Sequence, residues 1–141
     1  MTLAPLLAAP LAVQAHAFAA MAAFGLGLIQ FAAPKGTLPH RTLGWVWVVL
    51  MTLVAGSSFL IHTICSIGDF SLIHGLSIFT LGVLPVGVLH ARRHRVKQHW
   101  FTMSALFLGA LVIAGGFTLI PGRIMHDVAF GTRTAHGSCT G

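Results

Sequence analysis

Four long apolar runs dominate the chain, and each one is long enough to cross a membrane as a helix. The hydrocarbon core of a bilayer is roughly 30 Å thick, which takes about 20 helical residues. We expect the four spans at about 13–33, 39–65, 70–90 and 99–120. The sequence therefore predicts an all-α polytopic membrane protein, an up-and-down bundle of four transmembrane helices.

Composition indicates that lipid is the solvent of this bundle. The chain of 141 residues is 56% hydrophobic and 7% charged, whereas about 25% of the residues of a soluble domain are charged. We expect the four-helix domain to occupy residues 1–122. A short polar tail at 123–141 follows, with a short interfacial helix around 124–130.

Proline and glycine mark the ends of the spans. Pro34 stops the first span, Pro39 suits the first turn of the second, and Pro121 with Gly122 ends the fourth. Pro85 lies inside the third span and predicts a kink there. Small residues recur within the spans, and we interpret most of them as sites of tight helix packing.

Basic residues are concentrated in the first and third loops and predict the orientation of the bundle. The first loop carries Lys35 and Arg41, the residues 92–97 of the third loop carry four bases, and the second loop carries none. Basic loops stay in the cytoplasm, so both termini are expected outside, despite a minor counter-signal from Arg123 and Arg133. Trp45, Trp47 and Trp100 would then form an aromatic belt at the cytoplasmic boundary.

The same pattern suggests where the protein resides and what it contacts. We expect a multi-pass protein of the bacterial inner membrane, with anionic lipid headgroups beside its bases and no nucleic-acid partner. The apolar N-terminal stretch lacks the basic start of a signal peptide and is expected to be retained. Cys65 and Cys139 would both lie outside, and whether they pair is left open.

Nine histidines are the chemically suggestive feature, because ionisable side chains at membrane depth usually have a function. His16, His62 and His74 fall at a similar outer depth, whereas His40 and His99 lie at the cytoplasmic edge. His90 is expected to be an interfacial or headgroup-facing residue. In an up-and-down ring, helices one and three are diagonal, as are two and four.

Diagonal helices would place His16 opposite His74 at the outer level and His40 opposite His99 at the inner level. Two such pairs predict a dihaem b-type cytochrome, since haem iron accepts an imidazole on each face. Arg41 could pair with a haem propionate, and His62 could be an alternative ligand or a proton or quinone contact.

Other interpretations of the histidines are open beside this one. Boundary histidines can simply tolerate the interface; this applies to His40, His90, His94 and His99, and even more to His126 and His136 in the tail. A copper or zinc site is disfavoured because no Cys, Met or carboxylate lies near the outer histidines. Hydrolytic or transferase chemistry is not expected, because paired carboxylates, a nucleophile elbow and a phosphate loop are absent from the sequence.

A family resemblance rests on short motifs across residues 16–122. His16 opens the first span, Gly27, Gln30 and Phe31 stand near its end, His40, Arg41 and Gly44 open the next, and His99 with Trp100 opens the last. This pattern resembles bacterial membrane proteins of the uncharacterised DUF2306 type. The chain departs from that pattern in lacking basic residues after His99 and in only loosely echoing the usual Arg-x-x-x-Pro stretch. The resemblance implies architecture more than activity.

Two functions follow from the sequence as hypotheses. The first is a membrane electron-transfer protein that binds haem b, with quinone as a candidate partner. Its layout is similar to the core of b561-type cytochromes, an analogy of layout and not of sequence. The alternative is a non-catalytic accessory subunit packed against other membrane-protein subunits of a respiratory or photosynthetic complex.

Overall fold

The computed structural model describes residues 3–62, 72–119 and 124–130, and all regular secondary structure in these ranges is helical. Three spans are single helices, namely α2 (Leu11–Ala32), α3 (Leu38–His62) and α4 (Leu72–Arg92). The fourth comprises α5 (Val96–Leu106), the π-helix η1 (Phe107–Ile113) and α6 (Ala114–Phe117). All four are long and apolar enough to cross a membrane, as the sequence predicts.

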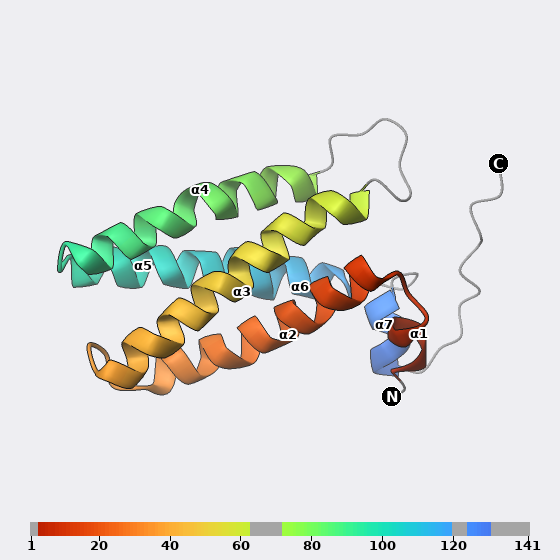
Figure 1. Ribbon diagram of the computed structural model, residues 1–141, viewed down its shortest axis with the longest axis horizontal. Coiled ribbons are helices and arrows are strands. Elements are labelled where there is room, and N and C mark those ends of the chain that lie inside the picture. Colours follow the sequence, from red (N-terminus) through yellow and green to blue (C-terminus); the bar gives the residue numbers. More distant parts are fainter. Residues whose placement is uncertain (1–2, 63–71, 120–123, 131–141) are drawn as a thin grey trace.

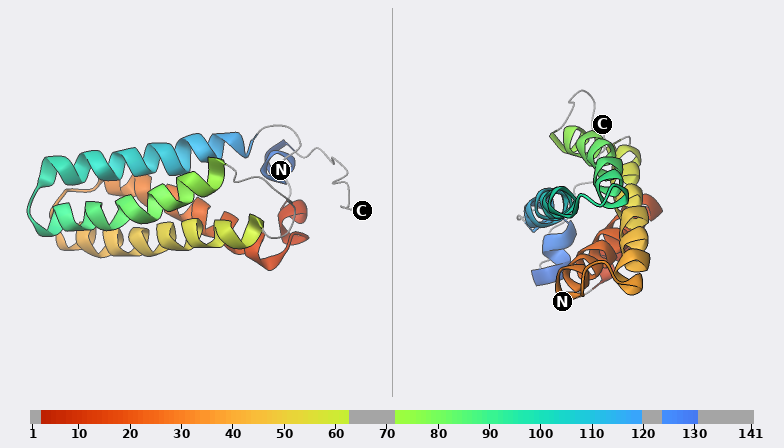
Figure 2. Two further views of the ribbon diagram at one scale, coloured as in Figure 1. Left: turned by 90° about the horizontal axis from the view of Figure 1, so that it is seen from above. Right: turned by 90° about the vertical axis from the view of Figure 1, so that its left-hand side faces the viewer.

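The four spans form a ring in chain order. Helix α2 packs on α3, α3 on α4 and α4 on α5, and a contact of α2 with η1 closes the ring (Figure 2). The pairs α2 with α4 and α3 with α5 therefore stand on the diagonals. This arrangement confirms the predicted up-and-down four-helix bundle.

The two ends of the bundle differ in character. The α2–α3 loop and the α4–α5 turn lie at one end, whereas the short helices α1 (Ala4–Leu7) and α7 (Ile124–Phe130) pack together at the other (Figure 1). Helix α7 occupies the residues predicted for a short helix in the tail. We call the two ends the basic end and the terminal end.

Two features inside the spans affect the course of the helices, and only the second goes beyond what the sequence predicts. Pro85 lies within α4, which continues past it to Arg92. In the fourth span the α-helix widens into η1, where Phe107 and Leu111 are buried. Leu106 is buried as well, and it precedes Leu111 by five residues, the spacing of one π-turn. The wider turn thus keeps both leucines on the inner face.

An aromatic core occupies the middle of the bundle. Trp47 is 6% exposed and packs with Met51, Leu84 and Phe107. Its indole N–H donates a hydrogen bond of 3.0 Å to the backbone oxygen of Ala23. The prediction of a belt residue is wrong for Trp47, because this side chain turns inward, whereas Trp45 and Trp100 are exposed.

Most of the bundle surface is apolar. In each span at most 22% of the residues of the most apolar stretch are buried within the protein. Large exposed side chains cover all four spans, including Phe18, Leu28, Val49, Leu60, Phe79, Val86, Leu108 and Phe117. Such a surface is stable only against lipid or another apolar protein surface.

The glycines divide into two groups that the sequence does not separate. A side chain at Gly27 would collide with the ring of Phe107 and approach Trp47, and one at Gly87 would collide with Met103. In contrast, several span glycines have open space where a Cβ would stand; these are Gly25, Gly56, Gly82, Gly109, Gly115 and Gly116. Tight packing inside the bundle is therefore the role of a minority of these residues.

Gly27→Ala should destabilise the protein relative to Gly25→Ala. Both changes bring the same gain in helix propensity, but only the first forces a methyl group against the Phe107 ring. Phe24 stacks on that ring at 5.5 Å and Phe31 meets its edge at 5.2 Å, so it cannot move freely. We expect a difference in unfolding free energy of about 1–3 kcal/mol, measured by denaturation in detergent micelles. Equal stabilities would show that the ring yields at no cost.

Candidate functional site

The predicted inner histidine pair meets at the basic end. His40 stands in the first turn of α3 and His99 in the first turn of α5, two helices on a diagonal of the ring. His99 and Lys35 are the neighbours whose positive charge would act on the His40 imidazole. The structure thus brings together the two side chains that the sequence places at this level.

His99 is oriented by a backbone carbonyl of the neighbouring helix. Its Nδ1 lies 2.9 Å from the oxygen of Gly87. A carbonyl oxygen can only accept, so Nδ1 carries the hydrogen and Nε2 keeps its lone pair. A Cβ at Gly87 would lie 2.5 Å from the Met103 methyl group, so this glycine lets α5 pack closely against α4 beside that carbonyl. An imidazole held through Nδ1–H in this way presents Nε2 to a metal.

His40 stands beside unsatisfied polar atoms. Gln30 on α2 donates from its amide nitrogen to the backbone oxygen of His40 at 3.0 Å. The other amide atom of Gln30, its Oε1, and Nδ1 of His40 are buried, with no hydrogen-bond partner among the described residues. Because buried polar atoms normally have partners, this corner of the bundle has capacity for a ligand or ordered water.

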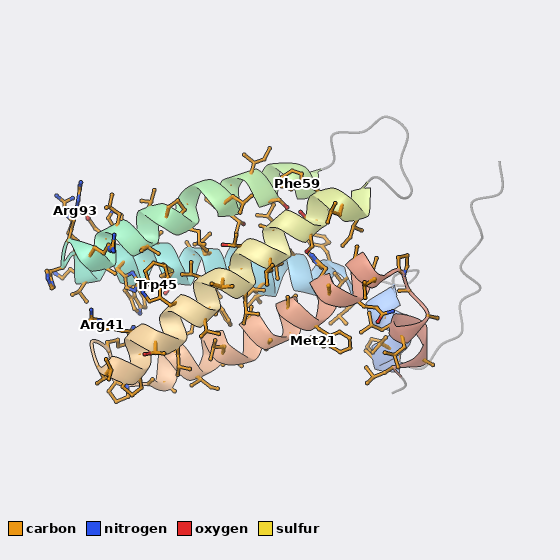
Figure 3. All side chains as sticks on the ribbon, viewed as in Figure 1. Met21, Arg41, Trp45, Phe59 and Arg93 are labelled. Carbon is orange, nitrogen blue, oxygen red and sulfur yellow. The ribbon has the colours of Figure 1, made fainter. Side chains whose placement is uncertain are left out.

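Arg41 follows His40 and lies at the same end (Figure 3). Its side chain is exposed. The position is compatible with the predicted pairing to a carboxylate at the membrane edge, since a guanidinium binds such groups through two parallel hydrogen bonds.

At the outer level, His16 is held by a serine that the sequence analysis did not single out as a partner. Its Nδ1 lies 2.9 Å from the hydroxyl oxygen of Ser57, and that hydroxyl donates to the oxygen of Val54 at 3.1 Å. Since the hydroxyl hydrogen is used, Ser57 accepts from Nδ1–H of His16. Nε2 of His16 therefore also keeps its lone pair. The side chains of His62 and His74 lie outside the described residues, so the outer pair stays a prediction.

Buried hydroxyls form a second outer feature between α3 and α4. Ser58 and Ser77 share a hydrogen bond of 2.6 Å, and Ser58 also bonds the oxygen of Ala55. Thr80, one turn after Ser77, donates to the oxygen of Leu76. Ser77 and Thr80 are three residues apart in the sequence, a spacing that places both on one face of a helix. That spacing could have indicated a polar contact of this face with a neighbouring helix. The hydrogen bond between Ser58 and Ser77 joins the two helices.

The remaining described histidines lie elsewhere. His90 is half-buried and turns toward α5, where its Nδ1 lies 3.4 Å from the hydroxyl of Thr102. The expectation that it is interfacial or faces the headgroups stays a prediction. His94 lies in the α4–α5 turn. His126 packs on Phe130 within α7, with ring centroids 4.8 Å apart. Among the described residues no three His, Cys, Asp or Glu side chains come together as a metal site.

Comparisons of the chain with protein-family models, curated proteins and solved structures find no match. The resemblance to DUF2306-type proteins and the similarity of layout to b561-type cytochromes therefore remain predictions.

The hydrogen-bond geometry predicts one tautomer for two imidazoles. With ¹⁵N-histidine labelling, NMR in micelles at neutral to alkaline pH should show His16 and His99 protonated at Nδ1. Ser57→Ala should shift His16 toward a mixture of tautomers, because the acceptor is lost, and leave the His99 signal unchanged. Nε2-protonated signals for the unaltered protein would contradict the assignment.

Proposed function

We propose that the protein is a membrane electron-transfer protein that holds b-type haem between imidazoles of diagonal helices. His40 and His99 are the inner ligands in this proposal, and His16 with His74 the outer ones. The observation that carries it is the meeting of His40 and His99 at the basic end, with Nε2 of His99 directed by Gly87. A bacterial inner membrane is the proposed location.

The residues at the basic end suit an imidazole-ligated group. Imidazoles from two diagonal helices could ligate a haem iron here, and buried atoms of Gln30 and His40 have no hydrogen-bond partner among the residues that the structure describes. Arg41 at the same end would bind a propionate. Haem bound here would supply one-electron chemistry, whereas the protein fixes the ring orientation of His99 and excludes water through the apolar spans.

The packed middle of the bundle separates the two levels. Trp47, Met51, Leu84, Leu106 and Phe107 fill the space between the helices. A porphyrin would therefore lie at the basic end or at the terminal end of this core and not within it. Two groups on either side of the core would form a path for electrons from one face of the membrane to the other, with quinone as a candidate partner.

An accessory role within a larger complex is supported by a different observation. The outward glycines of α3, η1 and α6 leave flat surface that another helix could approach. In this second proposal a respiratory or photosynthetic membrane subunit covers these helices, and the histidines serve only for packing.

Absorption spectra separate the two functions. Protein purified from cells with ample haem should show a Soret band that shifts on reduction with dithionite. His40→Ala and His99→Ala should each remove the inner component of a redox titration and lower the haem-to-protein ratio, because one axial ligand is lost. His90→Ala is the matched control, since His90 lies at the same end and is not a proposed ligand.

The outcomes are distinct. An equal haem ratio in His40→Ala, His99→Ala and His90→Ala would contradict the inner ligand assignment. A protein that never acquires a Soret band, while remaining folded by circular dichroism, would favour the accessory role.

A further inference from the structure

The α4–α5 turn has a geometry that holds cations at a fixed place. The N–H of His94 bonds the oxygen of Ala91 at 3.1 Å, and the N–H of Arg95 bonds the oxygen of His90 at 2.9 Å. These two bonds, with His94 at a φ of 55°, form a Schellman motif that ends α4. Helix α5 begins at the next residue, so Arg95 and Lys97 are held beside the last turn of α4.

An open hollow lies beside this turn. It measures about 350 Å³ and is lined by His90, Arg95, Lys97, Gln98, Phe101 and Thr102. A second hollow of about 470 Å³ adjoins it and shares Arg95, Lys97 and Gln98. The hollow thus combines two permanent cations, a titratable imidazole and an amide with one exposed aromatic ring.

Internal hydrogen bonds orient the polar side chains that line this hollow. Arg95 donates to the side-chain oxygen of Gln98 at 3.3 Å, which keeps the guanidinium near the start of α5. Thr102 donates to the backbone oxygen of Gln98 at 2.8 Å and so accepts from His90. No side chain caps the start of α5, where first-turn N–H groups favour an anion.

Within the part of the chain that the structure describes, no acid is found beside these cations. The sequence has no Asp or Glu between Asp69 and Asp127. Asp127 belongs to α7 at the terminal end, and Asp69 lies outside the described residues. The complement of the hollow is therefore an anion with several acceptor oxygens.

The residues around the hollow indicate which kind of molecule carries that anion. Phe101 is 71% exposed and the neighbouring Trp100 is 54% exposed, so apolar surface continues from the cations along α5. In the predicted orientation this end faces the cytoplasmic leaflet, which is rich in anionic lipid. We infer that the hollow at the α4–α5 turn binds the phosphodiester of an anionic phospholipid, whose acyl chains lie along Phe101 and Trp100.

Charge-matched variants test this site. Arg95→Gln/Lys97→Gln removes the two cations of the hollow, whereas Arg92→Gln/Arg93→Gln removes two cations beside it that line neither hollow. Arg93 projects from the α4 side of the turn (Figure 3). Both pairs lower the charge of the loop equally, so the effect on orientation signals is matched.

The binding assay uses the full chain in micelles of a neutral detergent. Titration with pyrene-labelled phosphatidylglycerol, followed by tryptophan-to-pyrene energy transfer, gives an apparent Kd, and pyrene-labelled phosphatidylcholine gives the neutral reference. We expect the first variant to weaken phosphatidylglycerol binding about tenfold or more and the second to change it much less. Binding of phosphatidylcholine should be the same in all three proteins.

Three results would overturn the inference. Equal weakening by both variants would mean that charge acts diffusely, without a site. Equal affinities of the unaltered protein for the two lipids would remove the need for an anion. Displacement of the probe by inorganic phosphate at the concentration of the lipid would assign the hollow to a free anion.

Discussion

A polar group inside this bundle is costly unless it finds a partner within the protein, because the hydrocarbon around it offers none. The helices satisfy the backbone, and side chains inside the spans then compete for the remaining lone pairs of carbonyl oxygens. Trp47 uses the oxygen of Ala23, His99 that of Gly87, and Ser57 that of Val54. Each bond fixes the rotation of one side chain, so the same requirement that builds the helices also orients the chemistry.

The four-helix architecture could be predicted because it depends on one requirement, that apolar helices span a lipid bilayer. The length and spacing of the apolar runs determine four spans, and short loops make consecutive spans antiparallel neighbours. The level of each histidine follows from its distance along a span, which is why the meeting of His40 and His99 could be expected. That prediction used only the position of each residue along its helix and the order of the helices in the ring.

The contacts of individual side chains depend on helix rotation, which a nearly uniform apolar sequence does not encode. Trp47 looked like a belt residue because its axial position is near the boundary, yet it faces the core. Gly25 and Gly27 are equivalent by composition but lie on different sides of α2. The π-turn at Phe107 adds a further rotation in the middle of the fourth span. Ser57 could be recognised as the partner of His16 only once these rotations were known.

The position of the core explains why the histidines gather toward the ends. Aromatic and aliphatic side chains fill the middle, where burying a polar group is most costly. Near the basic end, polar side chains such as Gln30 and His40 face the inside of the bundle. Polar side chains at this end can also contact water, lipid headgroups and the cations of the loops. There, buried atoms of Gln30 and His40 have no partner within the part of the protein that the structure describes. A group that satisfies those atoms would also tie α2 and α3 to α5 across the ring, so ligand binding and stability would be coupled at this end.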